Sequence, residues 1–157
     1  GVSGTFNGDT IGLAAAKAVI DKTERDDRAY YKRLWDVGYR LRDGFIGEAR
    51  AAGVDVDVPI GYPACWLPKF RGEELDVDPI IRDKKASLPW RTLWRQEMCR
   101  RGFLIGPAYV FSSFALTDLD VERYLEATRE AFAVLASVDN PSERLVGEAA
   151  GGGARVA

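Results

Sequence analysis

The sequence of 157 residues contains no histidine and only two cysteines. Without histidine, the chain has neither Ser-His-Asp nor Cys-His catalysis available to it, and it lacks the imidazole ligand common in zinc sites. Cys65 and Cys99 belong to no CxxC or CxH arrangement, so we expect two free, buried thiols in a reducing compartment. Any chemistry must therefore rest on carboxylates, lysines or a cofactor held elsewhere.

Long apolar runs and a strong charge of one sign are missing as well. No apolar run approaches the roughly 20 residues that a membrane span needs. A net charge of -2 gives no electrostatic basis for binding nucleic acid or an anionic membrane. Residues 1–9 show no basic start followed by an apolar run, so we expect no signal peptide. The composition, 46% hydrophobic and 29% charged, is typical of a globular protein, which we expect to be cytoplasmic.

Helical periodicity and capping residues predict four helices. They cover 10–22 behind the N-cap Asp9, 26–52 before Gly53, 87–101 before Gly102, and a last segment that begins at the cap Thr117 and ends near Ser137. The first helix is apolar around nearly its whole circumference. We therefore expect it to be buried against material that this chain does not contain.

Four segments are candidate strands: 54–58, 64–70, 103–105 and 109–114. The strict alternation VDVDV in the first predicts a half-buried strand, whereas Pro68 restricts the second to a sheet edge or a bulge. We expect a turn at Pro59, Gly61 and Pro63, and a polar loop over 71–86. Together these elements predict a small α+β domain, an antiparallel sheet of three to four strands with helices on one face.

The opening run Gly4-Thr5-Phe6-Asn7-Gly8-Asp9-Thr10, followed by an alanine-rich helix, resembles a signature of class III aminotransferases. In that family a Gly-Thr-Phe or Ser-Thr-Phe run and an Asn-Pro pair precede such a helix. Asp9 and Thr10 stand where the family has Asn-Pro. This departure leaves the helix start sound, because aspartate caps a helix as well as asparagine does.

The second half of the chain resembles the same family independently. Residues 100–122, RRGFLIGPAYVFSSFALTDLDVE, are similar to the end of the glutamate-semialdehyde aminomutase branch, where two strands lead into a final helix capped by threonine and an acid. The long helix between the two signatures also fits. The resemblance covers nearly all of residues 3–136.

This resemblance implies the C-terminal portion of a fold-type-I pyridoxal-phosphate (PLP) enzyme. Residues 1–25 would end the large PLP-binding domain, 26–52 would form a long connecting helix, 53–138 would form the small C-terminal α+β domain, and 139–157 would be a disordered tail. The implied activity is amino-group transfer by an aminotransferase or aminomutase. Residues 106–116 lack the C-terminal arginine that many class III transaminases use for a substrate carboxylate, which favours the aminomutase-like branch over an ornithine-type substrate.

The implied cofactor is pyridoxal 5'-phosphate, held covalently by a lysine outside this chain. None of the six lysines follows the family's lysine motif: Lys17, Lys22, Lys32, Lys69, Lys84 and Lys85. We therefore expect the isolated chain to be inactive. The implied partners are the missing N-terminal large domain, on the same polypeptide or a separate subunit, a second copy in a homodimer, and a small amino-compound substrate.

Thr5 is the sharpest candidate site residue. The matching threonine of the family donates a hydrogen bond to the cofactor phosphate across the dimer interface, and a hydroxyl with free backbone N–H groups suits an anion. Gly4 would allow close approach of the backbone, and Asn7 could line the same site. We expect no catalytic residue and no metal ligand in this chain.

Other conspicuous residues have simpler interpretations. Trp66, Trp90 and Trp94 are expected in the core rather than on a stacking surface, and Arg100-Arg101 at a helix C-terminus. Lys84-Lys85 is expected to be solvated, as is the set Asp55, Asp57, Asp76 and Asp78, whose spacing lacks the glycine and glutamate of a calcium loop. The rival to the enzyme hypothesis is a non-catalytic interaction module derived from such an enzyme.

Overall fold

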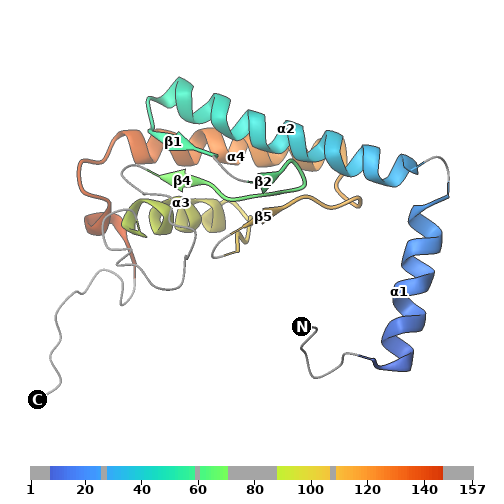
Figure 1. Ribbon diagram of the computed structural model, residues 1–157. Helices are drawn as coiled ribbons and strands as arrows, with labels where there is room; N and C mark the ends of the chain where they lie inside the picture. Colours follow the sequence, from blue (N-terminus) through green and yellow to red (C-terminus); the bar gives the residue numbers. More distant parts are fainter. Residues whose placement is uncertain (1–7, 26–27, 59–60, 71–87, 107–108, 147–157) are drawn as a thin grey trace, which may run out of the picture.

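The structure is a computed structural model that describes residues 8–25, 28–58, 61–70, 88–106 and 109–146 (Figure 1). Its elements follow one another as α1 (Thr10–Thr23), α2 (Ala29–Ala52), β1 (Val56–Asp57), β2 (Gly61–Tyr62), β3 (Cys65–Trp66), β4 (Lys69–Phe70), α3 (Leu88–Arg100), β5 (Val110–Phe111), α4 (Asp118–Ala136) and a short 3-10 helix (Pro141–Arg144). The expected α+β class with antiparallel pairing is confirmed. Among the described residues, no helix has the length and apolar character needed to cross a membrane.

The helix ends lie where the capping residues predict them. Asp9 caps α1, because its Oδ2 accepts the amide hydrogen of Gly12 at 2.6 Å. Gly53 ends α2 in the left-handed region at φ 71°, a conformation that costs glycine little. Thr117 and Asp120 form a reciprocal capping box at the start of α4. These local hydrogen bonds satisfy backbone groups that a helix end would otherwise leave without partners.

The core forms where α2 and α4 run side by side and α3 packs against α4 (Figure 1). Phe45 of α2 lies at its centre and is fully buried. Its ring centroid lies 5.1 Å from Trp66, 5.4 Å from Trp94 and 5.0 Å from Phe132. The prediction that these tryptophans are core residues is thus confirmed for Trp66 and Trp94, while Trp90 is partly buried against the core. Burial of each such side chain contributes roughly 1.5–3 kcal/mol.

The strands form two small sheets rather than the single sheet we expected. β1 pairs with β4, and a second sheet has the order β2-β3-β5. The expected strand over 64–70 is split, because its first half, β3, joins one sheet and its second half, β4, joins the other. The break falls at Leu67-Pro68, where proline has no amide hydrogen for a ladder. The expected placing of the helices on one face of a single sheet therefore does not apply in that form.

Residues 103–105 are not a strand, contrary to the prediction. The amide of Phe103 donates to Met98 O at 2.9 Å, which closes the end of α3 around Gly102. The carbonyl of Ile105 accepts from Arg95 Nε at 3.2 Å. Backbone groups that a ladder would use are thus engaged elsewhere. The expected turn is also displaced, since Gly61 lies in β2 and the chain reverses at Pro63-Ala64.

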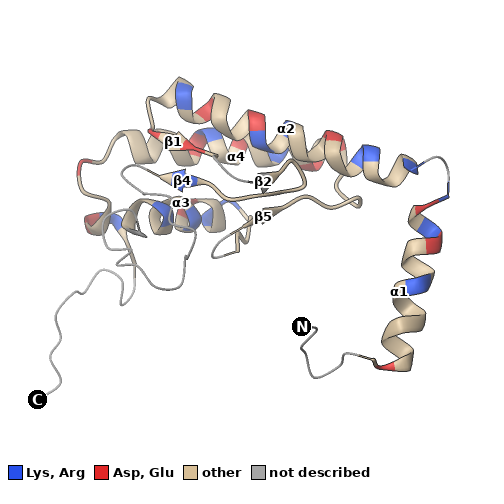
Figure 2. Ribbon diagram, viewed as in Figure 1, with Lys and Arg blue, Asp and Glu red and all other residues tan. Residues whose placement is uncertain are grey.

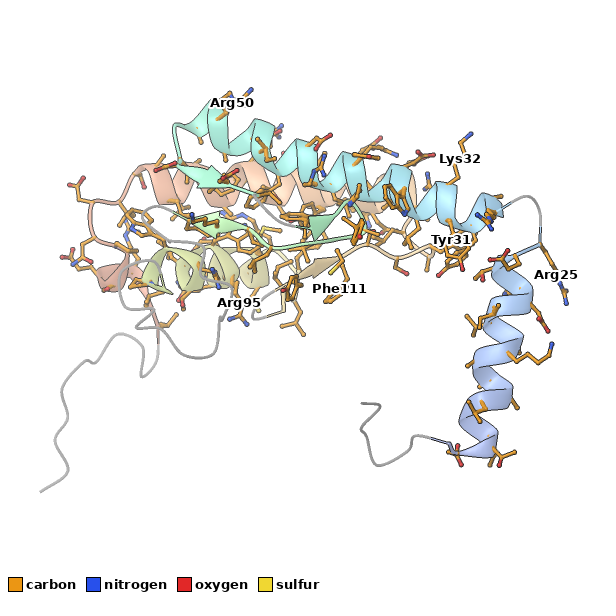
Figure 3. The ribbon with its side chains drawn as sticks, viewed as in Figure 1. Arg25, Tyr31, Lys32, Arg50, Arg95 and Phe111 are labelled. Carbon is orange, nitrogen blue, oxygen red and sulfur yellow. The ribbon has the colours of Figure 1, made fainter. Side chains whose placement is uncertain are left out.

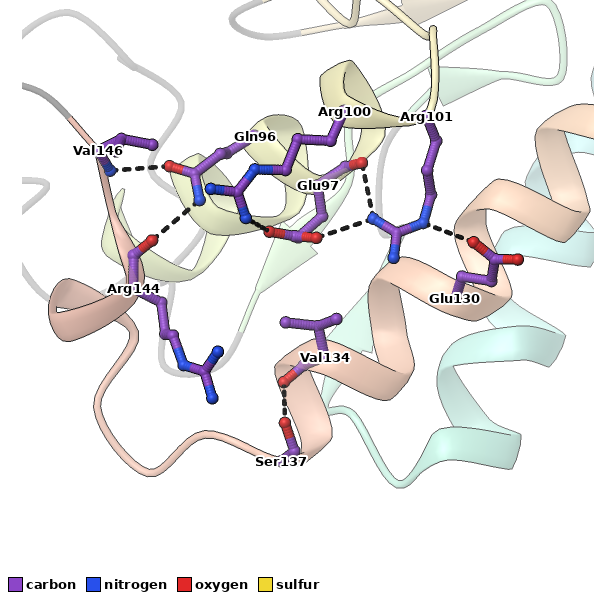
Figure 4. A network of polar contacts seen from close by, with 9 residues as sticks. All are labelled: Gln96, Glu97, Arg100, Arg101, Glu130, Val134, Ser137, Arg144 and Val146. Carbon is purple, nitrogen blue, oxygen red and sulfur yellow. Dashed lines mark hydrogen bonds and ion pairs between the residues drawn. The ribbon is translucent and has the colours of Figure 1, made fainter.

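The tail expected to be disordered from residue 139 is structured as far as residue 146. Asn140 caps the 3-10 helix, and Leu145 reaches the core. The side chain of Gln96 on α3 holds this segment, because its Nε2 donates to Arg144 O and its Oε1 accepts from Val146 N, both at 2.9 Å (Figure 4). Buried Pro141 and Leu145, the cap from Asn140 and the Gln96 side chain together hold this segment, where the sequence showed no periodicity. Residues 147–157 lie outside the described residues.

α1 extends away from the body of the molecule at a steep angle to α2 (Figure 1). Its apolar residues are largely exposed: Ile11 80%, Leu13 61%, Val19 60% and Ile20 56%. Only Thr23, at its end, is buried, and the hydroxyl of that residue lies 3.1 Å from Tyr31 Oη. The expected burial of this helix is therefore not provided by the described part of the chain.

Candidate functional site

The predicted cofactor contacts lie outside the described residues. Gly4, Thr5 and Asn7 all belong to residues 1–7, so the assignment of Thr5 to the phosphate stays a prediction. The described chain begins with Gly8, at φ 87°, and with Asp9, whose carboxylate occupies the N-terminus of α1. The negative charge of Asp9 at this position repels a phosphate from the helix end itself. Any phosphate contact from this region must therefore come from the preceding loop.

The described lysines do not have the surroundings of a Schiff-base lysine. Such a lysine needs a site that favours its neutral amine, usually a desolvated one. Lys17 is 76% exposed at the side chain, and its Nζ forms an ion pair with Asp21 Oδ2 at 2.6 Å. Lys22 and Lys32 are exposed, and Figure 3 shows Lys32 projecting into solvent from α2. Lys69 is half-buried at the start of β4, and Lys84 and Lys85 lie outside the described residues.

A connected polar cluster joins the end of α3 to α4 (Figure 4). Glu97 is buried, and its two carboxylate oxygens accept from Arg100 at 2.6 Å and Arg101 at 2.8 Å. Arg101 also reaches Glu130 of α4 at 2.8 Å. Burial alone would raise the pKa of Glu97, but the hydrogen bond from Arg101 and the charge of Arg100 outweigh it and hold the pKa below its usual range. The expected place of these arginines, at a helix C-terminus, is confirmed, and the cluster is structural.

A second ion-pair cluster fixes α2 to the start of α4. Asp118 accepts from Arg33 at 3.2 Å and also from Arg40, and Arg33 donates to Leu116 O at 3.1 Å. Hydrogen bonds from Arg40 and Arg33 hold the pKa of Asp118 below its usual range. Figure 2 shows such charged residues along α2 and α4, whereas β5 and the β2-β3 hairpin carry none.

Sequence reasoning missed a group of exposed aromatic residues around the three-stranded sheet. Tyr62 is 72% exposed and Phe111 is 68% exposed, and Cys65 lies between them in the sheet. Both cysteines are free, but contrary to expectation Cys65 is only half-buried and Cys99 is exposed. The predicted thiols are therefore accessible to reagents.

Comparison with solved structures defines the fold. An omega-transaminase from Sphaerobacter thermophilus matches with a TM-score of 0.68 and 24% identity, covering 88% of this chain and 31% of that one. The FumI protein of Sphingopyxis sp. MTA144, solved in its PLP internal aldimine form, matches with a TM-score of 0.53 and 22% identity, covering 68% of this chain and 23% of that one. The chain therefore has the fold of part of a PLP-dependent transaminase.

Comparison with curated proteins is more specific. The chain is 24% identical over 138 residues to a glutamate-1-semialdehyde 2,1-aminomutase from Clostridium beijerinckii, covering 88% of this chain and 31% of that protein. It is 30% identical over 155 residues to the enzyme of that name from Halorubrum lacusprofundi, covering 82% of this chain and 34% of that protein. The resemblance inferred from the two motifs is thereby confirmed, and the chain spans about a third of the length of these relatives. No family model matches.

Proposed function

We propose that this chain is the C-terminal part of a PLP-dependent aminotransferase or aminomutase of the glutamate-semialdehyde aminomutase type. The observation that carries the proposal is the match of most of this chain, in both sequence and structure, to about a third of such enzymes. PLP, when bound, would supply the carbonyl group that takes up and releases the amino group of a small amino compound. The residues of this chain would help to hold the cofactor and enclose the substrate.

The organisation of the chain supports this assignment. In the proposed enzyme, residues 1–25 end the large PLP-binding domain, residues 26–52 connect the domains, and residues 53–138 form the small one. The exposed apolar surface of α1 agrees with this division, because a helix with Ile11 at 80% and Leu13 at 61% exposure lacks a packing partner in the described body. The separate core around Phe45 fits a small domain that is organised without α1.

The cofactor phosphate would be contacted by the loop before α1. Thr5 offers a hydroxyl donor and Gly4 allows the backbone to approach closely, which is the donor chemistry that a phosphate requires. Because Asp9 already caps α1, the loop rather than the helix end would supply these donors. In a homodimer with active sites at the interface, this contact would be made to the cofactor of the other protomer, and the small domain would form part of the substrate-entry wall.

Borohydride reduction followed by mass spectrometry tests the proposal. Reduction fixes a lysine-bound PLP as a stable adduct. The complete polypeptide should carry one adduct on a lysine outside this chain, because none of the six lysines here follows the family's motif. The isolated chain incubated with PLP should carry no stoichiometric adduct. An adduct on any of Lys17, Lys22, Lys32, Lys69, Lys84 or Lys85 would contradict the proposal.

The second candidate function is a non-catalytic interaction module derived from such an enzyme. Such a module would keep the fold described above without the Schiff-base lysine, which none of the six lysines of this chain supplies by motif. The intact mass of the natural protein separates the two, since a lysine-bearing large domain, on the same polypeptide or encoded directly upstream, is needed only for the enzyme.

A further inference from the structure

The three-stranded sheet has two unlike faces. Strand pairing aligns Tyr62 with Cys65 and Cys65 with Phe111, while Trp66 is aligned with Gly61 and Val110. Directly paired residues of an antiparallel sheet point to the same face. The Trp66 face is buried in the core, with Trp66 at 0% and Val110 at 7% exposure. The opposite face carries the row Tyr62, Cys65 and Phe111, which we call the aromatic row.

The aromatic row is apolar where an antiparallel sheet ordinarily faces water with polar side chains. Tyr109 extends it, because its ring centroid lies 6.1 Å from that of Phe111. Trp35 of α2 extends it at the other end, at 6.0 Å from the Tyr62 ring and 39% exposure. Several exposed aromatic rings in contact with one another are the composition of an interface rather than of a free surface.

The backbone beneath this surface is rigidly held. Gly38 of α2 lies so close to the hairpin tip that a Cβ atom at this position would be 2.2 Å from Pro63 O. Beside it, the amide of Ser112 donates to Ala64 O at 2.9 Å, which ties β5 to the hairpin. The Ser112 hydroxyl lies 3.3 Å from both Leu34 O and Ala64 O. A surface that is fixed before binding loses little conformational entropy when a partner docks.

We propose that the aromatic row is a docking surface for the part of the enzyme that precedes this chain. This inference rests on the proposed function. The relatives are about three times as long as the match, so a body of roughly twice this chain's size is available to cover the row. Figure 3 shows Phe111 projecting on the side towards which α1 extends, whereas Lys32 and Arg50 project from α2 on the opposite side. α1 and the aromatic row thus face one body, and their apolar surfaces are covered together.

The two cysteines provide a direct test, because Cys65 lies inside the aromatic row and Cys99 lies on α3. Alkylation rates with N-ethylmaleimide are measured for each thiol by mass spectrometry. The dilute isolated chain is compared with the complete polypeptide, or with this chain bound to the separate subunit that supplies the remaining length. We expect Cys65 to react at least about tenfold more slowly in the complete enzyme, with Cys99 as the matched control. Equal Cys65 rates in the two samples overturn the proposal.

Substitutions then show whether the row itself makes the contact. Tyr62→Ser and Phe111→Ser change exposed side chains and leave the buried Trp66 face unaltered, so the domain should still fold. In the complete enzyme both variants should restore rapid alkylation of Cys65. Leu119→Ser, at a 53% exposed position of α4, is the control and should leave Cys65 protected. Undiminished protection in both row variants would overturn the proposal.

Three further outcomes separate this inference from its alternatives. Protection of Cys65 in the complete enzyme that disappears on dilution identifies a second copy as the occupant, and overturns the proposal. A complete enzyme that gives the borohydride adduct but leaves Cys65 unprotected overturns this inference alone. Protection of Cys65 without any adduct supports the docking surface and contradicts only the proposed function.

Discussion

Gly38 lies where helix α2 packs closely against the backbone of the hairpin turn. A Cβ atom there would lie 2.2 Å from Pro63 O and 2.7 Å from Ala64 N, both backbone atoms that cannot rotate away. We expect Gly38→Ala to destabilise the fold by about 1–3 kcal/mol, as overpacking does. Gly47 of the same helix has nothing within 4 Å of its Cβ position, so Gly47→Ala should instead stabilise by about 0.5–1 kcal/mol. Urea unfolding of both variants checks this, and two changes of the same sign would contradict it.

Thr5 carries the prediction at the proposed cofactor site. In the complete enzyme, Thr5→Ala removes one charge-assisted hydrogen bond to the phosphate, worth roughly 1.5–3 kcal/mol. PLP affinity should therefore fall by about ten- to a hundredfold. Thr5→Ser keeps the hydroxyl and should lose much less. The loss is measured as cofactor dissociation on dilution, monitored by PLP absorbance, with the fold checked by circular dichroism. Equal affinity in wild type and Thr5→Ala would remove this assignment.

At the scale of elements, the junction of α3 with α4 depends on pH through Glu97. A carboxyl group whose pKa is lowered by folding stabilises the protein above its ordinary pKa, 4.5 for Glu97, and this contribution is lost as the pH falls through the folded value. We expect Glu97→Gln to cost about 2 kcal/mol at pH 7, because Arg100 and Arg101 lose their carboxylate. The difference in free energy of unfolding between wild type and Glu97→Gln should shrink steadily as the pH falls below 4.5.

The control for this prediction is Glu122→Gln, a change at an exposed position of α4. Its free energy of unfolding should stay within about 0.5 kcal/mol of wild type across the same pH range. Thermal unfolding at a series of pH values measures both variants. If the free energies of unfolding of wild type and Glu97→Gln differ as much at pH 3 as at pH 7, then Glu97 stabilises the fold through packing rather than through its charge.

Helix α1 determines how the isolated chain behaves in solution. Its exposed apolar residues favour association, since each buried leucine or isoleucine side chain contributes roughly 1.5–3 kcal/mol. We expect the purified chain to self-associate in light scattering as its concentration rises. The double variant Leu13→Gln/Ile20→Gln keeps good helix formers and should associate much less, whereas Leu119→Gln on α4 should behave as wild type. If the wild-type chain stays monomeric at high concentration, α1 does not need a packing partner outside this chain.

The helices were predictable from the sequence, and so was the location of most strands within 54–58, 64–70 and 109–114, but the strand lengths and pairing were not, for a physical reason. Helix ends are set by neighbours in sequence, such as Asp9 with Gly12 and Thr117 with Asp120. Each strand here has only two residues, too few for an alternating pattern, and its pairing depends on distant segments. Residues 103–105 resemble a strand in sequence, yet the amide of Phe103 donates to Met98 O and the carbonyl of Ile105 accepts from Arg95. That competition cannot be deduced from local propensity.

For the whole molecule, the sequence predicted the family resemblance and the core but not the exposed surface. Trp66 and Trp94 are buried as expected, because large apolar side chains at these spacings belong to the core more often than to a stacking surface. The aromatic row escaped prediction because its members come from three separate strands and share a face only through pairing. The predicted contacts Gly4 and Thr5 lie outside the described residues, and they stay predictions.

The ion pairs of Arg33 and Arg40 with Asp118 also have a consequence for folding during synthesis. Arg40 and Arg33 find this partner 78 and 85 residues further along the chain. At about 5–20 residues per second, a ribosome leaves the apolar stripe of α2 without its covering helix for on the order of ten seconds. Closing so long a loop also slows the search for the native pairing. Newly made α2 is therefore open to association with other chains until α4 has been synthesised.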